Sequence, residues 1–339
     1  MKRWMTGAAV FGMVLGLTIG AALAADKVLA TMSYIFHGGH TPFFTALESG
    51  RYKKLGLDVS ITRGYGSKAT IATIFTGKSQ FGEAGTGTSI ISRSRGVNVK
   101  QVGMIYHNDQ SEVAAMKSSG IRTPADFRGR SVGDVAASST RTIFPALLAK
   151  NGLKESDINF ITMTAAALGS SLLAGKVDMI LTFALTAVAV KRKAKAMGRE
   201  VVEIPYGEYG LPFYGNGIVT QEALIEKNPN LVRRFVKATL EALTWAVDNP
   251  EAAVRYVVQS KPALGYDNTL EQWKTTIRFV ATPQSLKTGL GYMEEKKMRF
   301  TQDIVTKYMK GKMGSSAVNI RDVYTNRFLP GKLVPKSAK

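Results

Sequence analysis

The feature that most constrains this chain is an alternation of short apolar runs with helix-like patterns, from about residue 27 to residue 220. Leu57 to Thr62 alternates apolar and polar residues, as a half-buried strand does. Lys68 to Thr76 follows with a helical pattern and stops at Gly77. A chain that repeats strand and helix in this way folds as α/β units with mostly parallel sheets. We therefore expect an α/β fold, with a mainly helical region after residue 220.

The length and one interruption of the pattern predict two lobes. A chain of 339 residues is long enough for about two domains. Around residues 108–111 the chain leaves its first α/β unit, and Gly215 to Thr220 indicates the return. We expect lobe 1 to comprise residues 25–108 and 216–339, and lobe 2 residues 109–215. Two crossings of this kind place a ligand cleft between the lobes.

The N-terminal segment predicts export. Lys2 and Arg3 precede an apolar stretch from Ala8 to Leu23, and Ala22-Leu23-Ala24 puts small residues at the −3 and −1 positions of a cleavage site. The alternative is a retained membrane anchor, but the stretch is rich in Gly and Ala and near the lower length limit for a span. We expect residues 1–24 to be a cleaved signal peptide and the protein to be periplasmic.

Cysteine content and charge exclude several classes. The chain has no Cys, which excludes disulfides, Cys-based redox chemistry, Cys-ligated zinc and a lipid-modified N-terminal Cys. The net charge is +20, but the basic residues are spread along the chain. One local cluster, Lys191-Arg192-Lys193 with Lys195, is typical of the solvated face of a helix. Because no nucleic-acid-binding signature accompanies this charge, we expect no nucleic-acid partner.

Seven segments, in order along the chain, resemble the solute-binding proteins of the thiamine-pyrimidine, sulfonate and nitrate group of ABC importers. The segment Gly120 to Arg130, with Thr123-Pro124-Ala125-Asp126-Phe127 inside it, is the most recognisable. The other six segments are Pro42–Val59, Thr76–Gly82, Leu173–Asp178, Asn228–Val232, Asp248–Ala253 and Tyr324–Leu329. In the segment Thr76–Gly82, Gln80 occupies the position where the family commonly has Asp.

This resemblance implies a type II periplasmic-binding-protein fold, with two α/β lobes around a ligand cleft. It implies a monomer that delivers a small molecule to an ABC permease and ATPase complex at the inner membrane, without a cofactor. Aromatic residues and few acids in the loops favour a planar heterocycle or a small anion. A thiamine-pyrimidine precursor leads, followed by sulfonates, aromatic acids and flavin-like rings.

Two alternatives differ in class. One is a ligand-binding module for a periplasmic signalling receptor, which would share the fold. The other is an enzyme, since a eukaryotic relative of the family makes the thiamine pyrimidine. The resemblance ties that activity to a Cys-rich motif, and this chain has no Cys. No nucleophile triad or pair of catalytic carboxylates stands out either, so we expect no enzyme activity.

Ligand contacts in such a cleft come from loops at the carboxyl ends of strands and from helix N-termini. After the first strand, Phe36 is placed to stack on a planar ring and His37 to hydrogen-bond a ligand. His37 and His40 are also potential metal ligands, but no third ligand is evident, so we expect no metal. In the Gly-rich turn Gly85 to Ser89, Thr86 and Thr88 are candidates, with a plain helix cap as the alternative.

Lobe 2 offers a second set of candidates, which lie at the start of a helix. The hydroxyl groups at the start of this helix and the side chain of Arg141 would contact the ligand from the opposite side of the cleft. The Arg141 guanidinium would pair with a carboxylate, sulfonate or phosphate group. Aromatic residues in the loops and one amide complete the prediction, the amide reading ring nitrogens. These further candidates are Ser138, Ser139, Thr140, Tyr65, Phe183, Tyr209, Tyr214 and Asn216. We expect the lobes to close on a hinge at residues 106–111 and 214–218.

Overall fold

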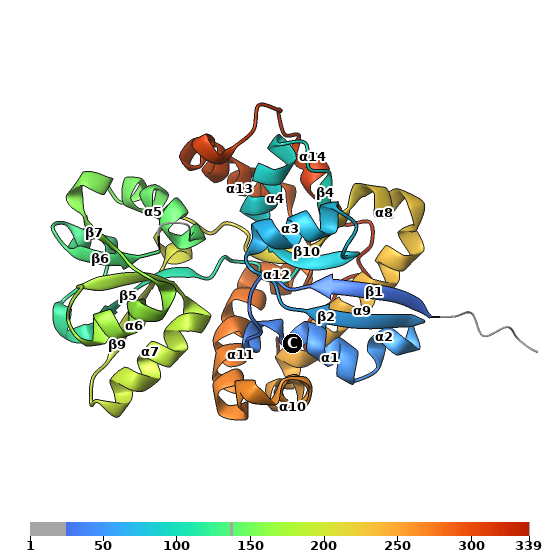
Figure 1. Cartoon of the computed structure of the whole chain (residues 1–339), viewed down its shortest axis with the longest axis horizontal. Helices are drawn as coiled ribbons and strands as arrows, with labels where there is room; N and C mark the ends of the chain where they lie inside the picture. The colour runs from blue at the N-terminus through green and yellow to red at the C-terminus, as the bar shows by residue number, and fades with distance from the viewer. Residues whose placement is uncertain (1–24, 136–137, 339) are drawn as a thin grey trace, which may run out of the picture.

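The structure, a computed structural model, describes residues 25–135 and 138–338. The predicted signal peptide, residues 1–24, lies outside the described residues. Two lobes lie side by side, each built on one five-stranded sheet with helices packed against it (Figure 1). We call them lobe 1, which contains the first strand, and lobe 2. No helix in the described part of the chain is long and apolar enough to cross a membrane.

Lobe 1 is built on a sheet of strand order β2-β1-β3-β10-β4. Leu57 and Val59 are buried while Asp58 and Ser60 are exposed, which is the alternation that predicted this strand. β1 runs parallel to β2, with Val28 opposite Val59. The strands are β1 Asp26–Thr31, β2 Leu57–Thr62, β3 Phe81–Gly85, β4 Val99–Met104 and β10 Asn216–Gln221.

The helices of lobe 1 come from both ends of the chain. The long helix α9 begins where Asn228 accepts a hydrogen bond from the backbone N–H of Leu231, with Pro229 in the first turn. The helices are α1 Thr41–Glu48, α2 Arg51–Lys54, α3 Ser67–Phe75, α4 Thr86–Ser94, α8 Glu222–Lys227, α9 Pro229–Asp248, α10 Pro250–Ser260, α11 Tyr266–Val280, α12 Pro283–Thr288, α13 Glu295–Tyr308 and α14 Ile320–Val323.

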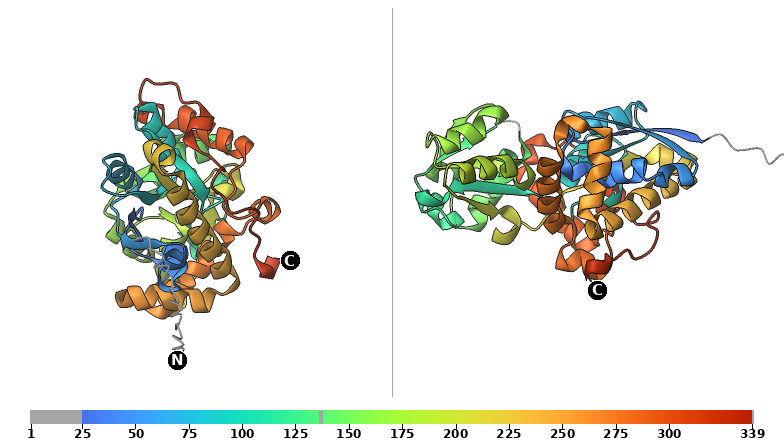
Figure 2. Two further views of the ribbon diagram at one scale, coloured as in Figure 1. Left: turned by 90° about the vertical axis from the view of Figure 1, so that its right-hand side faces the viewer. Right: turned by 90° about the horizontal axis from the view of Figure 1, so that it is seen from below.

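Aromatic residues join the helices of lobe 1 to its sheet. Phe235 on α9 stacks on Phe81 of β3, with ring centroids 4.0 Å apart, and on Tyr52 at 5.1 Å. Trp273 of α11 is fully buried and donates from its indole to the carbonyl of Ala246, at 2.9 Å. The core thus fixes α11 against the rest of lobe 1. Figure 2 shows the chain ending against the same lobe, where Asp248 accepts hydrogen bonds from two terminal backbone N–H groups.

Lobe 2 has the strand order β7-β6-β8-β5-β9. Its helix α5 begins at Ser139 and continues through Pro145. The elements of lobe 2 are β5 Ser111–Met116, β6 Ser131–Asp134, α5 Ser139–Lys150, β7 Asn159–Thr162, α6 Ala165–Leu173, β8 Met179–Phe183, α7 Ala184–Ala196 and β9 Val201–Pro205. Short 3-10 helices in both lobes are η1 Gly38–His40, η2 Lys117–Ser119, η3 Pro124–Phe127, η4 Glu155–Asp157, η5 Tyr206–Tyr209, η6 Pro262–Leu264, η7 Lys310–Lys312 and η8 Lys336–Ala338.

The expectation of mostly parallel sheets is wrong for the strands beside the crossings. β10 runs antiparallel to β3 and β4, and β5 runs antiparallel to β8 and β9. The reason is that each crossing enters its new sheet at the edge where the parallel strands end. Gly85 at the end of β3 lies opposite Asn216 at the start of β10, and Phe183 at the end of β8 lies opposite Ser111 at the start of β5. The carboxyl edges of both sheets therefore meet at the crossings.

The two crossings run side by side and are hydrogen-bonded to each other. The backbone N–H of Tyr106 donates to the carbonyl of Asn216 at 2.9 Å, and the N–H of Gly215 donates to the carbonyl of Tyr106 at 3.1 Å. A Cβ on Gly215 would lie 3.0 Å from the Cβ of Tyr106, so this close approach favours glycine. The lobe boundaries at residues 108 and 215 remain predictions, and they fall within this paired segment.

Candidate functional site

Four polar side chains meet at the carboxyl edge of the lobe 1 sheet, beside the crossings. β3 supplies Glu83, the segment after β1 supplies Ser33 and His40, and β10 begins with Asn216. One oxygen of Glu83 accepts from the Ser33 hydroxyl at 2.6 Å and lies 3.1 Å from His40 Nε2. The other accepts from the Asn216 amide at 3.2 Å. We call these four residues the junction cluster.

Glu83 is ionised in spite of complete burial. Burial alone would raise the pKa of its carboxyl, but His40, Ser33 and His37 outweigh that effect and lower the pKa to about 2. An ionised carboxylate only accepts hydrogen bonds, so His40 Nε2 is the donor in this pair. The Nδ1 atom of His40 is buried and has no hydrogen-bond partner among the described residues.

A second histidine lies against the first. The rings of His37 and His40 stack with centroids 3.8 Å apart. Burial, and then the neighbouring His40, lower the pKa of His37 well below its ordinary value, so its ring is neutral at pH 7. His37 Nδ1 accepts from the backbone N–H of Gly39 at 3.0 Å. A neutral ring with Nδ1 as acceptor carries its proton on Nε2, and His37 therefore offers one N–H donor.

Two glycines hold this histidine loop in place. A Cβ on Gly38 would lie 2.5 Å from the carbonyl oxygen of Thr269 on α11, and the N–H of Gly38 donates to the Gln272 side chain at 2.8 Å. A Cβ on Gly39 would lie 2.6 Å from the hydroxyl of Tyr106, which donates to the Gly39 carbonyl at 2.9 Å. The loop is thus packed against α11 on one side and against the first crossing on the other.

Gln110 faces the junction from the lobe 2 side. Its backbone carbonyl accepts from Ala184, at the start of α7, and its side chain is only 4% exposed. Neither atom of its amide has a hydrogen-bond partner among the described residues, although the amide lies near Tyr106. Buried polar atoms in native proteins are nearly always paired. His40 Nδ1 and the Gln110 amide are therefore candidates for polar contacts with a bound molecule.

Exposed apolar side chains lie next to Ser33. Tyr34, Ile35 and Tyr65 are 47%, 44% and 76% exposed, and the guanidinium of Arg63 lies 4.6 Å from the Tyr65 ring. The loops that carry them are tied together, since Gly64 N donates to the carbonyl of Tyr34 at 3.1 Å. An aromatic and apolar rim beside a polar cluster suits a flat ring with polar edges. Of these rim residues, Tyr65 was a sequence candidate.

Arg141 is already paired within lobe 2. Its guanidinium lies 2.8 Å from the buried carboxylate of Asp134 and 2.7 Å from Glu155, and it stacks over the ring of Phe160 at 3.9 Å. A ligand anion would have to compete with two carboxylates for this side chain. The predicted contact between Arg141 and a ligand stays a prediction, with this competition as a point against it.

The hydroxyl residues at the start of α5 cap the helix. Ser138 accepts from the N–H of Arg141 at 3.1 Å and pairs with the Thr140 hydroxyl at 2.8 Å, while Ser139 is exposed. Tyr209 lies at the other end of α5, where its carbonyl accepts from Asn151 at 3.3 Å. The two ends of this helix are about 20 Å apart at 1.5 Å per residue. Tyr209 therefore does not lie beside Ser138, and its contact with a ligand stays a prediction.

The other candidates fall into two groups. Tyr214 is 1% exposed, and its hydroxyl accepts from the N–H of Glu294 at 2.8 Å, while the buried Thr86 donates its hydroxyl to the carbonyl of Gly215. Both hydroxyls have partners within the protein in this structure, and their contact with a ligand stays a prediction. Thr88 and Phe183 are half-buried at the carboxyl edges of lobe 1 and lobe 2.

Phe36 is part of lobe 1 packing. Its ring makes an edge contact with Phe44 at 5.3 Å and with His40 at 6.3 Å, and the ammonium of Lys261 lies 4.8 Å from its centroid. It is half-buried, so its role as a stacking surface for a ligand stays a prediction. Within the described part of the chain, no three His, Asp or Glu residues are arranged to hold a metal ion.

Sequence reasoning placed His37 and Asn216 near the site but missed Ser33, Glu83 and Gln110. Glu83 had a detectable signal. It is the one acid in the run Phe81-Gly82-Glu83-Ala84-Gly85, which is otherwise apolar or glycine and follows a strand pattern. A charged residue in a buried strand is rare unless it is paired, so its position alone marks a candidate site.

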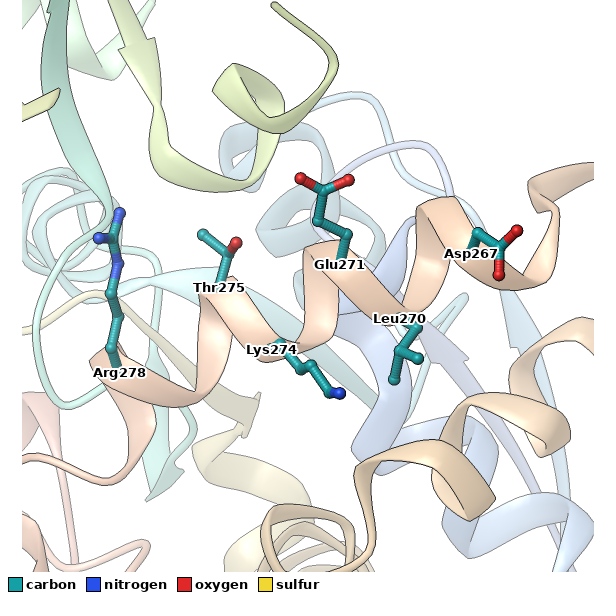
Figure 3. A pocket seen from close by; sticks show the side chains of 6 residues that line it. All are labelled: Asp267, Leu270, Glu271, Lys274, Thr275 and Arg278. Carbon is teal, nitrogen blue, oxygen red and sulfur yellow. The ribbon is translucent and has the colours of Figure 1, made fainter. Parts of the chain in front are cut away.

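A shallow depression of about 390 Å³ lies along α11 (Figure 3). Its lining includes Asp267 at one end and Arg278 at the other, with Glu271 and Thr275 pointing toward the ribbon of lobe 2. All of its lining residues come from this one helix. The depression is open and charged, which is less suited to a small ligand than the buried junction cluster.

Comparison with known proteins identifies the family. The model of the family described as NMT1/THI5 like matches residues 37–253, well over half of the chain. The chain belongs to the NMT1/THI5-like family. The matched range contains His37 and three of the four residues of the junction cluster, while Ser33 lies before it. The predicted resemblance is thereby confirmed.

Members and structural neighbours include named binding proteins. The chain is similar to the riboflavin-binding protein RibY of Chloroflexus aurantiacus, at 26% identity over 90% of this chain and 87% of that protein. It is similar to the formylaminopyrimidine-binding protein of Halalkalibacterium halodurans, at 22% identity over 70% of this chain and 72% of that one.

Among solved structures, the periplasmic aliphatic sulphonate binding protein SsuA of Escherichia coli matches with a TM-score of 0.69. The match has 15% identity and covers 88% of this chain and 91% of that one. This likeness confirms the two-lobed periplasmic-binding-protein fold.

Proposed function

We propose that this protein captures a small, flat, uncharged heterocycle between its two lobes and delivers it to an ABC permease and ATPase complex. The observation that carries the proposal is the junction cluster of lobe 1, together with Gln110, whose amide lies near Tyr106, the residue that contacts the histidine loop at Gly39. The named relatives are binding proteins, for riboflavin and for a formylaminopyrimidine. A solute-binding role agrees with both.

The chemistry of the site favours a neutral ring over an anion. The junction cluster carries one ionised carboxylate and no Lys or Arg. Arg141, the cation expected to bind an anion, is held by Asp134 and Glu155. A sulfonate would thus lie near Glu83 without a Lys or Arg side chain free to pair with it. A pyrimidine precursor of thiamine leads, with a flavin second and sulfonates behind both.

The polar atoms of the site match the edge of such a ring. His37 provides a donor, His40 presents its Nδ1 atom, and the Gln110 amide provides one donor and one acceptor. Heterocycles of this class carry ring nitrogens and amino or carbonyl groups that pair with this set. Tyr65 at the rim provides an exposed aromatic face for stacking.

Closure on the paired crossings is the proposed mechanism. A ligand that contacts His40 on lobe 1 and Gln110 on lobe 2 gains both contacts only when the lobes are together, so binding shifts the population toward the closed arrangement. The backbone pairing of the crossings at Tyr106 and Asn216 keeps the lobes attached while they rotate. We propose that the closed protein is a periplasmic monomer without enzyme activity, released by signal-peptide cleavage.

A thermal-shift panel on the mature protein tests this function. The protein is first unfolded and refolded to remove carried ligand, then mixed with riboflavin, formylaminopyrimidine, alkanesulfonates, nitrate and aromatic acids. A ligand at about 100 times its dissociation constant adds about 2.7 kcal/mol to the free energy of unfolding. We expect a pyrimidine or a flavin to raise the melting temperature. A shift with sulfonates alone would refute the neutral-ring proposal, and no shift with any compound would count against the carrier function.

A further inference from the structure

A charged contact joins the lobes away from the junction cluster. Arg278 lies near the end of α11 in lobe 1, and α11 packs against α7 of lobe 2. The guanidinium of Arg278 lies 3.3 Å from a carboxylate oxygen of Glu203 on β9 and 3.5 Å from one of Glu112 on β5. Figure 3 shows Arg278 at the lobe 2 end of the depression along α11. One side chain of lobe 1 thus reaches two acids of lobe 2.

Glu203 and Glu112 differ in their other hydrogen-bonding and charged neighbours. Glu203 also pairs with Lys191 of α7, at 3.0 Å, within lobe 2. Glu112 is fully buried, and neither of its carboxylate oxygens has a hydrogen-bond partner among the described residues. Burial, and then the neighbouring Glu203, raise the pKa of Glu112 well above its ordinary value, although Arg278 and Lys191 act in the opposite direction. The raised pKa favours the neutral carboxyl of Glu112, so the ionic contact between the lobes is the one that joins Arg278 to Glu203.

We propose that Arg278 acts as a latch, bridging Glu112 and Glu203 to hold lobe 1 against lobe 2 and so setting how readily the protein closes. Lobe motion itself rests on the proposed function. Opening the lobes takes Arg278 away from both acids, so its ion pair with Glu203 is lost. The latch therefore favours the closed arrangement before any ligand binds. Arg278 touches no ligand in this account, so it is a positioning residue.

Lys191 provides a matched control. It pairs with the same Glu203, but both residues belong to lobe 2. Replacing Lys191 by Ala removes an ion pair of the same acid without removing a contact between lobes. Arg278→Lys keeps a positive charge on α11 but lacks the fork that reaches two carboxylates at once.

The distance between the lobes is measurable because the chain has no Cys of its own. Asp267 on α11 and Lys195 on α7 are exposed, so spin labels on D267C and K195C report the separation of these two helices. Pulsed electron resonance on the full mature protein without ligand gives the populations of short and long separations. The variants to compare are Arg278→Ala, Arg278→Lys and Lys191→Ala, each in this labelled background.

We expect Arg278→Ala to lower the ratio of short to long separations about fivefold, the effect of a partly exposed ion pair. Arg278→Lys should give an intermediate ratio, and Lys191→Ala the wild-type ratio. An unchanged ratio in Arg278→Ala would overturn the latch, as would an equal change in Lys191→Ala. Since no ligand is present, this result is independent of the ligand panel, and failure of one does not imply failure of the other.

Discussion

Replacing Gln110 by Met should stabilise the empty protein and weaken ligand binding, two effects in opposite directions. The Gln110 side chain is 4% exposed, and neither atom of its amide has a partner among the described residues. An unsatisfied buried polar group costs about 1–3 kcal/mol. Met has a similar length and shape without the amide, so it removes this cost while it fills the same space.

The size of each effect follows from the same contact. We expect Gln110→Met to raise the free energy of unfolding of the ligand-free protein by about 1 kcal/mol, the low end of that range, because the nearby Tyr106 hydroxyl compensates part of the cost. In the complex the amide pairs with the ligand, so the variant loses one or two hydrogen bonds. A net loss of about 1.4 kcal/mol lowers affinity tenfold.

Urea unfolding of the refolded protein measures the first effect, and calorimetric titration with the compound found in the ligand panel measures the second. Gln272→Met is the matched control, because the Gln272 side chain accepts a hydrogen bond from Gly38 at 2.8 Å. That change should lower stability, since it leaves a backbone N–H unpaired. The reasoning is refuted if Gln110→Met destabilises the empty protein, because its amide would then be satisfied, or if affinity is unchanged.

Further predictions concern the same region. Glu83→Gln should lower the free energy of unfolding by about 3 kcal/mol near pH 6, because folding lowers the Glu83 pKa from 4.5 to about 2. Since the folded pKa is the lower one, urea titrations should show this difference from wild type shrinking as pH falls from about 4.5 toward 2. A difference that stays constant with pH would contradict this prediction. The pKa of His37 in the folded protein lies below 6.5, so as pH falls the unfolded chain binds a proton at this residue before the folded protein does. Wild type should therefore lose more stability than His37→Gln as pH falls through 6.5. Equal pH profiles of stability would contradict a neutral His37. Tyr65→Ala should change the free energy of unfolding by less than about 0.5 kcal/mol, since the ring is 76% exposed, yet weaken ligand binding about three- to tenfold in calorimetry. Gly38→Ala should cost about 1–3 kcal/mol in urea unfolding, because a Cβ there would lie 2.5 Å from the Thr269 carbonyl; an unchanged midpoint would show that the loop moves aside freely.

The sequence predicted the elements well because their signals are local. β2 spans Leu57–Thr62 as expected, since its alternation of buried and exposed residues is visible in six residues. The helix cap at Asn228 is equally local, because its side chain accepts from the N–H three residues on. The start of α1 also depends on tertiary contacts, because α1 begins at Thr41 after a 3-10 turn, η1, that packs on α11.

The candidate site was less predictable because its contacts join distant segments. Glu83 and Asn216 are 133 residues apart in the chain, and only the antiparallel return of β10 beside β3 brings them together. Arg141 and Tyr214 looked available in sequence because nothing local shows their partners. Asp134 and Glu155 hold the first, and Glu294, 80 residues away, meets the second. The residue types showed which side chains are chemically able to bind a ligand. The fold determines which of these side chains already have partners within the protein.

A crystal structure of the protein with the solute that the ligand panel identifies tests the central claim most directly. The account predicts one solute at the junction of the lobes, within hydrogen-bonding distance of His40 Nδ1 on lobe 1 and of the Gln110 amide on lobe 2, with its ring beside Tyr65. A solute bound in the depression along α11, or one that contacts a single lobe, would contradict it.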